Sequence, residues 1–497
     1  MSIKKYLRNS PNFLDISYKK ITKKFTFCTH ASSSSLPTFT PNQKNRFNIP
    51  RLTSYDTLNY KEPPKSCTML VRDFIDDSLY NPNYGYFSKN VAIFSTSDDN
   101  VVKFNEIKDN LEFLNVVGKQ YQEFENNLEK EDKQFLRQIR HTPTELFKPW
   151  YGYSIAKYIA TEYNLNPQND LIIYELGAGN GTLMLNILDY LQKFEPAIYK
   201  KTKYRVVEIS HRLAAEMQKS KNNKNQRVGF LGSSGGRDAA AKTLNNHHDC
   251  IEIINKNIFD WCEVVNENCF FLACEVLDNF AHDVIRYDAI NEKPLQGVVI
   301  IDNEGDFEEV YEPINDPLIS KLLSIRNQTS YKSPVLQNRL LRKLRNKLPL
   351  AYNMTQSEFI PTKLLQFLIV LKHYFPKHRL IITDFYKLTN SILQQDGGGI
   401  GDNAPAVQTR FQQTMIPCST YLVKPGYFDI IFPINFELLK DLYQLMFFSS
   451  KSSLDEKVKI LTHKNFMERY ADLNKTKTSS GENPLLLYYE NVKFLLT

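Results

Sequence analysis

The sequence has no long apolar run and little that could cross-link the chain or bind a metal. No stretch of its 497 residues approaches the ~20 consecutive apolar residues that span a bilayer, so no stable membrane insertion is expected. The seven cysteines are scattered and include no Cys-x-x-Cys pair, which argues against a disulfide framework and a structural zinc site. His247, His248 and Cys250 lie close together but have no second ligand pair, so we predict no metal.

Several catalytic signatures are also missing. The chain contains no Gly-x-x-x-x-Gly-Lys-(Ser/Thr) phosphate loop, no Gly-x-Ser-x-Gly nucleophile turn and no His-Glu-x-x-His zinc motif. These absences argue against the common nucleotide hydrolases, serine hydrolases and zinc proteases. Hydrophobic residues make up 42% of the chain, which is enough to form one large domain or two smaller ones, and a globular enzyme is the default expectation.

Acidic residues are scarce at the N-terminus. The net charge of +7 is uneven, because the first fifty residues carry nine Lys and Arg against the single acid Asp15, together with a serine run at 32–35. This composition is typical of a mitochondrial transit peptide, so residues 1–50 are predicted to direct the chain to the mitochondrial matrix. The alternative is an ordinary disordered basic tail. Because so much of the positive charge lies in this segment, we expect no nucleic-acid partner.

The remainder of the chain divides into three predicted parts. Residues 51–165 form an N-terminal helical region, with apolar residues at helical spacing over 68–80 and a solvated helical insertion at about 100–140. In residues 166–445 strands and helices alternate, which predicts an α/β fold with a parallel sheet. Residues 446–497 are predicted to be a C-terminal helical extension.

Within the α/β region the pattern predicts a strand at 171–176, a helix at 180–194, a strand at 204–208 and a helix at 211–220. The later predictions are strands at 250–254, 269–274 and 380–384, a hairpin of 284–287 with 297–301, a surface insertion at 221–248 and a basic amphipathic helix at 337–348.

The most informative motif lies where the first of these strands ends. In the sequence Tyr-Glu-Leu-Gly-Ala-Gly-Asn-Gly-Thr-Leu, Gly177, Gly179 and Gly181 remove the Cβ atoms that would keep a ligand away from the backbone. A dinucleotide-binding turn would have its third glycine where this chain has Thr182. Gly-x-Gly-x-Gly preceded by an acid, here Glu175, is instead typical of enzymes that use S-adenosylmethionine. The spacing favours S-adenosylmethionine, with a nicotinamide dinucleotide as the alternative.

Four acids near strand ends are the other candidate site residues. Glu175 can bind the methionyl ammonium of the cofactor, and Glu208, which closes the next strand, can accept hydrogen bonds from ribose hydroxyls. Glu275 and Asp278 follow the strand at 269–274, where class I methyltransferases place the methyl group, and are predicted to orient and deprotonate a substrate guanidinium. The alternatives are a surface acid at a strand end for Glu208 and, for the pair, acids favoured by a helix N-terminus.

These motifs resemble the MidA-like family, in blocks from about residue 68 to 440. Pro82, Gly85, Tyr86 and Phe87 are similar to an early Pro-x-x-Gly-Tyr-Tyr motif of that family. Further similar blocks are 175–184 around the glycines, 207–213 around Glu208, 275–280 with Cys274 in the place of an Asn, 382–386 and 426–436.

The resemblance implies a class I methyltransferase with a Rossmann-like sheet, an N-terminal helical region and α/β insertions. It also implies S-adenosylmethionine as cofactor, and a protein arginine as substrate, in a core subunit of respiratory complex I. The (Asp/Asn)-Pro-Pro-(Tyr/Phe) segment of enzymes that methylate adenine or glutamine amino groups is absent. Two departures concern the substrate side: Asp384-Phe385-Tyr386 lacks the usual glycine, and 142–147 stands where the family has a Thr-Ser-Pro-Glu segment.

Three functions therefore remain open from the sequence. The first is a mitochondrial protein arginine N-methyltransferase in complex I assembly, and the second is an assembly or scaffold protein that keeps the fold but has lost turnover. The third, a nicotinamide oxidoreductase, is disfavoured by Thr182. A protein substrate is the expected partner, and a homodimer is compatible with all three.

Overall fold

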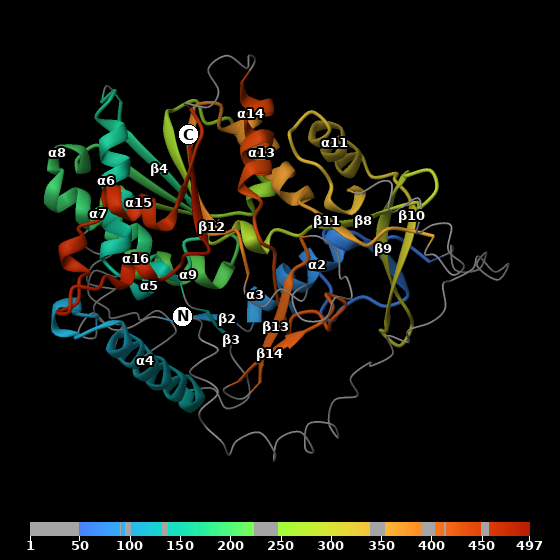
Figure 1. Cartoon of the computed structure of the whole chain (residues 1–497), viewed down its shortest axis with the longest axis horizontal. Coiled ribbons are helices and arrows are strands. Elements are labelled where there is room, and N and C mark those ends of the chain that lie inside the picture. Colours follow the sequence, from blue (N-terminus) through green and yellow to red (C-terminus); the bar gives the residue numbers. More distant parts are fainter. Residues whose placement is uncertain are drawn as a thin grey trace. The chain divides into compact units, whose positions relative to one another are not determined.

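A seven-stranded sheet organises the chain in the computed structural model (Figure 1). The described residues belong to one compact unit, Ile49–Thr497. They are residues 49–89, 91–94, 101–131, 138–140, 142–167, 169–222, 247–337, 353–388, 403–411, 414–448 and 457–497. Nearly all of the predicted transit peptide at 1–50, nearly all of the basic helix predicted at 337–348 and most of the predicted insertion at 221–248 fall outside these residues.

The seven-stranded sheet has five parallel strands and two antiparallel additions at one edge. In spatial order the strands are β6 (Ile251–Asn255), β5 (Thr202–Glu208), β4 (Leu171–Leu176), β7 (Cys269–Cys274), β12 (His378–Phe385), β17 (Val492–Leu496) and β16 (Lys459–Thr462). The chain leaves β4 toward β5 and β6 and later returns to β7 on the other side of β4. The carboxyl ends of β4 and β7 therefore flank a topological switch point, which is where open parallel sheets bind ligands.

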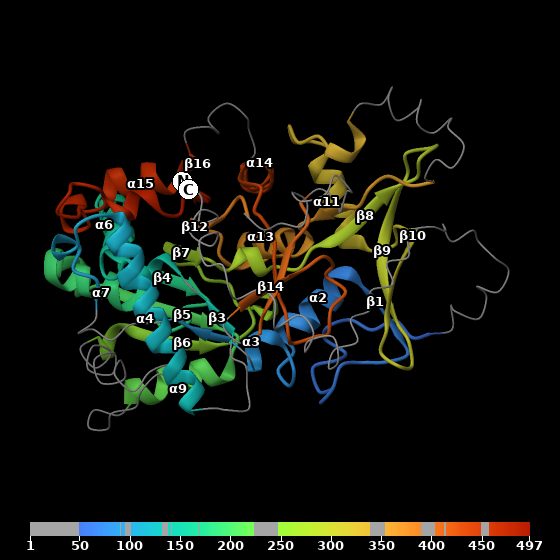
Figure 2. The same ribbon diagram turned by 60° about the horizontal axis from the view of Figure 1, so that its bottom comes forward.

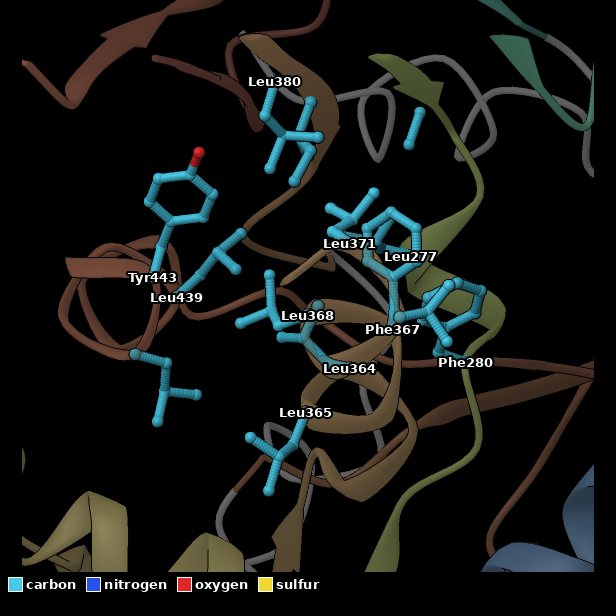
Figure 3. Packing of buried hydrophobic residues seen from close by; sticks show 14 of the residues in the cluster. Leu277, Phe280, Leu364, Leu365, Phe367, Leu368, Leu371, Leu380, Leu439 and Tyr443 are labelled. Atoms are coloured by element: carbon cyan, nitrogen blue, oxygen red, sulfur yellow. The ribbon is translucent and has the colours of Figure 1, made fainter. Parts of the chain in front are cut away.

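Helices cover both faces of this sheet (Figure 1). Successive residues of β7 alternate between the faces: Leu272 packs in the cluster that includes α6 and α7, and Phe271 packs in the cluster that includes α13 and α14. Figure 3 shows Leu364, Leu368 and Leu371 of α13 within the second cluster. The covering helices are α6 (Trp150–Tyr163), α7 (Thr182–Phe194) and α15 (His463–Tyr470) on one face, and α11 (Pro317–Arg326), α13 (Thr362–Tyr374) and α14 (Phe436–Phe447) on the other.

A second, antiparallel sheet stands beside the first (Figure 2). Its strands are β1 (Cys67–Leu70), β8 (Asp283–Tyr287), β9 (Pro294–Ile301), β10 (Phe307–Pro313) and β11 (Glu358–Ile360). Helix α2 (Val71–Tyr80) packs on β8 and β9 with its buried face, which includes Phe74 and Ile75. Helix α2 therefore lies against the second sheet, and it also borders the site described below.

The smaller elements complete the fold. They are α3 (Tyr86–Lys89), α4 (Asn110–Glu131), α5 (Pro143–Leu146), α8 (Pro196–Tyr199), α9 (His211–Asn222), α16 (Pro484–Leu487), the paired strands β2 (Val91–Ile93) and β3 (Gln138–Arg140), and the sheet of β13 (Ala406–Phe411), β14 (Thr414–Cys418) and β15 (Asp429–Ile431). The short 3-10 helices are η4 (Phe104–Glu106), η5 (His248–Cys250), η6 (Ile258–Asp260), η7 (Leu277–Asn279), η8 (Pro334–Leu336) and η11 (Leu473–Lys475).

The α/β architecture and the predicted strands of its parallel sheet are confirmed, and so is the predicted hairpin, β8 with β9, which lies in the second sheet. The C-terminal segment differs from the predicted helical extension, because it contributes β16 and β17 to the main sheet as well as α15 and α16. Four of the five residues of β17 are buried. A short strand that is buried on both faces has no periodicity that separates it from a helix, which is why the pattern did not predict it.

Two properties of the described residues bear on function. Within them, no helix is both long and apolar enough to cross a bilayer. The same part of the chain holds no group of three or more His, Cys, Asp or Glu side chains that could bind a metal ion.

Candidate active site

A cavity lies at the carboxyl edge of the seven-stranded sheet. Its walls come from the turn after β4, the ends of β5 and β7 and the segment after β6, and further residues come from α2, α3 and α5. Of the residues predicted from the sequence, the lining includes Glu175, Gly177, Gly179, Glu208 and Glu275. The two other predicted residues, Gly181 and Asp278, are not part of the lining.

The glycine turn joins β4 to α7 in a conformation that needs glycine. Gly177, Gly179 and Gly181 have φ values of 67°, 57° and 76°, in the left-handed region that other residues rarely adopt. A Cβ on Gly177 would also lie 3.1 Å from Cγ2 of Val276. Gly181 has a structural role. Its amide donates to the carbonyl of Ala178 at 2.8 Å, and this hydrogen bond closes the turn at the start of α7.

Glu175 is buried at the base of the cavity. Its Oε2 accepts a hydrogen bond from the hydroxyl of Tyr204 at 2.8 Å. Burial raises the pKa of Glu175 to about 7; the Tyr204 hydrogen bond opposes this rise, and the nearby charge of Glu208 adds to it. A buried carboxylate of this kind is stabilised by a cation, so Glu175 is suited to a positively charged group of a ligand.

Glu208 ends β5 and is also buried within the cavity wall. Its Oε1 accepts a hydrogen bond from the backbone amide of Ser210 at 2.8 Å. Burial raises its pKa to about 7, and hydrogen bonds from backbone amides, with Ser210 the strongest, oppose the rise. Glu175 and Glu208 belong to neighbouring parallel strands, and the glycine turn lies at the same edge of the sheet. The arrangement can therefore hold one ligand with a cationic end and a hydroxyl-bearing end.

Glu145 is a site residue that the sequence analysis did not identify. It lies on α5 and lines the cavity, and its Oε1 accepts hydrogen bonds from Thr182 Oγ1 at 2.6 Å and Asn180 Nδ2 at 3.2 Å. Lys148 forms an ion pair with Glu145, with 3.5 Å between Nζ and Oε2. The sequence does contain a signal for the start of α5, a threonine followed by proline at the first helical position. Thr142 caps the helix, because its side chain accepts a hydrogen bond from the amide of Glu145. The segment at 142–147 thus packs against the glycine turn.

Glu275 follows β7 and lines the cavity in a strained conformation. Its φ of 56° lies in the left-handed region, which costs a residue other than glycine about 1–2 kcal/mol. The bend is held from β12, since the amide of Glu275 donates to the carbonyl of Thr383 at 2.9 Å. A residue other than glycine keeps such a conformation only where its surroundings hold it there, and Glu275 is held in this way on the cavity wall.

Asp278 occupies a different position from Glu275. It lies on η7 with no exposed surface, and its close neighbour is Asp384 of β12. Asp384 Oδ2 accepts from the amides of Leu277 at 2.9 Å and Asp278 at 3.1 Å. Burial, followed by the charge of Asp278, raises the pKa of Asp384 well above its ordinary range. This geometry suits Asp278 to holding η7 in place rather than to touching a substrate.

The segment after β7 is fixed from several sides. Leu277 and Phe280 insert into the hydrophobic cluster beside Phe367 of α13 (Figure 3). Asn279 lines the cavity and donates to Asp429 Oδ1 at 3.1 Å and to the carbonyl of Ile430 at 3.0 Å. The late sequence block around 426–436 therefore supports the cavity wall rather than forming it.

The sequence block at 82–87 and the block at 426–436 also lie in contact. Gly426 has a φ of 84°, and a Cβ there would lie 1.8 Å from the carbonyl oxygen of Tyr84. Its amide donates to the carbonyl of Ser78 on α2 at 3.1 Å. This close backbone approach needs glycine, and it fixes α2 and the turn after it against β15.

The cavity fits S-adenosylmethionine on structural grounds. Gly177 and Gly179 leave room for close approach to the backbone, Glu175 offers a carboxylate to an ammonium group, and Glu208 offers one to ribose hydroxyls. The cavity lies at the switch point of the sheet, where a nucleoside cofactor is expected.

Comparisons with known proteins agree with this geometry. Residues 154–449, more than half of the chain, match the model of a family described as S-adenosyl-L-methionine-dependent methyltransferases. A relative from Schizosaccharomyces pombe, named protein arginine methyltransferase NDUFAF7 homolog, mitochondrial, is 24% identical over 350 residues, which cover 68% of this chain and 66% of the relative. The match thus spans slightly less than two thirds of that relative's length.

Among solved structures, a protein from Burkholderia thailandensis with bound S-adenosyl-homocysteine aligns with 93% of this chain and 95% of its own. The TM-score is 0.50 and the sequence identity 11%, so this likeness concerns the fold alone. The sheet order, the glycine turn and the family match all indicate a methyltransferase, and its cofactor is S-adenosylmethionine. The chain belongs to the MidA-like family of S-adenosylmethionine-dependent methyltransferases.

Proposed function

We propose that this protein is a mitochondrial protein arginine N-methyltransferase, acting in the matrix on a core subunit of respiratory complex I. The observation that carries the proposal is the position of Glu275, a carboxylate-bearing residue in a strained bend on the wall of the cavity that also contains the glycine turn. The name of the Schizosaccharomyces pombe relative supports the arginine substrate and the mitochondrial location. The basic, acid-poor first fifty residues support import.

The chemistry follows from what Glu275 can do for a guanidinium. S-adenosylmethionine supplies an electrophilic methyl group. A guanidinium stays protonated at ordinary pH and presents a planar fork of donors, so a carboxylate can fix its orientation through paired hydrogen bonds. As the new nitrogen–carbon bond forms and the methyl–sulfur bond of the cofactor breaks, that nitrogen must lose a proton, and in this proposal Glu275, which lines the cavity, accepts it. Asp384 contributes by accepting from the amides of Leu277 and Asp278, which fixes the segment that follows Glu275.

The direct test is the identity of the methylated residue. The purified protein is incubated with isotope-labelled S-adenosylmethionine and a mitochondrial extract from cells that lack the gene, and labelled proteins are analysed by mass spectrometry. We expect label on arginine, at a site whose methylation is also lost in the gene-deficient cells. Label on lysine, on glutamine or on a small molecule would contradict the arginine proposal while leaving the family assignment intact.

The same assay separates an enzyme from a scaffold protein that retains the fold. A scaffold would bind S-adenosylmethionine, or restore complex I assembly, without transferring label. Restoration of assembly by the Glu275→Gln variant, with no transfer detected for the wild type, would support the scaffold.

A further inference from the structure

The cavity extends beyond the elements that fit the cofactor. The turn after β4, the end of β5 and the segment after β6 line one half, and α2, α3 and η7 with the end of β7 line the other. We call the second half the outer pocket and define it by Asp76, Tyr80, Phe87, Glu275, Asn279 and Phe280. The basic residues of the cavity lining, Arg212 and Lys256, follow β5 and β6 and are not among the residues that define the outer pocket.

Aromatic rings form the walls of the outer pocket. Tyr80 and Phe87 are stacked, with ring centroids 5.2 Å apart and an interplanar angle of 17°. Phe280 packs against Phe259, which also lines the cavity, with centroids 5.4 Å apart. The Tyr80 hydroxyl donates to the carbonyl of Asn279 at 3.3 Å, which ties α2 to η7 across the pocket. The rings are therefore held as flat, fixed surfaces.

Asp76 brings a second carboxylate to this pocket, from an element other than that of Glu275. Its Oδ2 accepts from Ser54 Oγ at 2.9 Å and forms an ion pair with Lys363 Nζ at 3.1 Å. Among the described residues, Oδ1 of Asp76 takes part in no hydrogen bond. Since Asp76 lines the cavity, this oxygen is the acceptor it can offer to a ligand.

The groups around Lys363, next to the outer pocket, stabilise a buried positive charge. Only 3% of Lys363 is exposed, yet its ammonium lies 4.4 Å from the ring centroid of Phe259 as well as beside Asp76. A carboxylate together with an aromatic face compensates the loss of hydration that burial imposes on a positive charge. The same two kinds of group line the neighbouring outer pocket.

We propose that the outer pocket is a subsite for a planar cation, the guanidinium of the substrate, which stacks on the Tyr80 and Phe87 wall and donates to both Asp76 and Glu275. The proposal rests on the proposed function and deepens it by naming the residues that select the substrate. A guanidinium is favoured over an ammonium because it is planar, weakly hydrated and able to donate to two carboxylates at once. An anion is disfavoured, because the two acids of the outer pocket, Asp76 and Glu275, outnumber the one ammonium that pairs with Asp76, that of Lys363.

The test measures binding of small probes to the full-length protein saturated with S-adenosyl-homocysteine. Ethylguanidinium is compared with propylammonium, which has a compact charge, and with ethylurea, which is planar and neutral, by ligand-observed NMR titration. For the wild type we expect ethylguanidinium to bind roughly tenfold or more tightly than either other probe, the scale of one charge-assisted contact with an aromatic face. Equal affinities for the three probes would overturn the subsite.

Four variants locate the binding. Asp76→Asn removes the charge and keeps the size, and it should weaken ethylguanidinium binding about fivefold or more. Tyr80→Leu should weaken it by a similar factor, whereas Tyr80→Phe, which keeps the ring, should lose less. The matched control is Asp260→Asn, because Asp260 is an exposed acid next to Phe259 that bonds Tyr55 and does not line the cavity. An equal loss in Asp260→Asn would show that general charge, not the outer pocket, attracts the probe.

Folding and the proposed function are checked separately. Each variant is used only if its melting temperature and its affinity for S-adenosyl-homocysteine stay close to the wild type, and Tyr80→Leu still tests the pocket if Asp76→Asn unfolds. Guanidinium binding that depends on Asp76, without methylarginine in any product, would refute the proposed function and support the subsite. Methylarginine formation with guanidinium binding unchanged in Asp76→Asn and Tyr80→Leu would refute the subsite and leave the function standing.

Discussion

Replacing Glu175 by glutamine should stabilise the cofactor-free protein, and only at neutral to basic pH. Glu175 is 3% exposed, and burial raises its pKa from 4.5 to about 7. Glutamine has nearly the same size and keeps an oxygen that can accept the Tyr204 hydroxyl, so the change removes the charge and little else. The expected gain is therefore the cost of keeping a buried carboxylate ionised.

The sign and size of this stability change follow from the linkage between protonation and folding. A carboxyl whose folded pKa lies above its unfolded pKa favours folding most below the unfolded value, near 4.5, and loses that contribution as the pH rises through about 7. A shift of 2.5 units, at 1.36 kcal/mol per unit, corresponds to about 3 kcal/mol. We expect Glu175→Gln to raise the free energy of unfolding by about 2–3 kcal/mol at about pH 8, relative to its effect at about pH 4.5.

Urea unfolding of both proteins across this pH range measures the difference, and comparison with the wild type cancels the titration of groups that do not interact with Glu175. Glu490→Gln makes the same change at an exposed position and should alter the free energy of unfolding by no more than about 0.5 kcal/mol. The reasoning is refuted if the effect of Glu175→Gln is the same at both ends of the range. The same variant should bind S-adenosylmethionine more weakly at about pH 8, because the ionised carboxylate is what an ammonium group requires.

Four further changes test other parts of the site. Gly179→Val places a β-branched residue at a φ of 57° and should abolish S-adenosylmethionine binding in calorimetry; retained binding would contradict the role of the turn. Glu275→Gln should lower methyl transfer by roughly 100-fold while cofactor affinity stays within a few fold, and loss of that affinity would mark Glu275 as structural. Glu145→Ala removes the acceptor of two hydrogen bonds at the glycine turn and should weaken cofactor binding by about 10- to 100-fold, so an unchanged dissociation constant would rule out the support we assign it. Deleting about the first 35 residues should prevent import without changing cofactor affinity, and normal import of the shortened chain would exclude a transit peptide.

The acids that line the cavity at strand ends could be predicted from the sequence because they follow successive strands of one sheet. In a parallel sheet the carboxyl ends of neighbouring strands share one edge, so identifying β4, β5 and β7 is enough to bring Glu175, Glu208 and Glu275 together. The glycine turn is a local motif whose spacing alone indicates the conformation. Nothing in this step required knowledge of how distant segments pack.

The residues that cover this edge could not be predicted in the same way. Glu145 lies on a helix of four residues, too short to show a period, and its contact with Thr182 depends on how α5 packs beside α7. Asp278 was predicted to face the substrate because it follows a strand end, but the end of a strand does not specify which way each residue of the next turn points. Its burial against Asp384 depends on the pairing of β7 with β12, which lie more than a hundred residues apart in the chain.

The outer pocket shows why these covering segments matter for specificity. Its aromatic wall and Asp76 come from α2 and α3, whose position is set by β1 pairing with β9 and by the close approach of Gly426 to Tyr84. Neither contact can be inferred from local pattern, because each joins segments separated by hundreds of residues. A Rossmann-like sheet with a glycine turn can therefore be recognised from a sequence before its substrate can, since the cofactor is bound at strand ends and the substrate meets elements placed by tertiary packing.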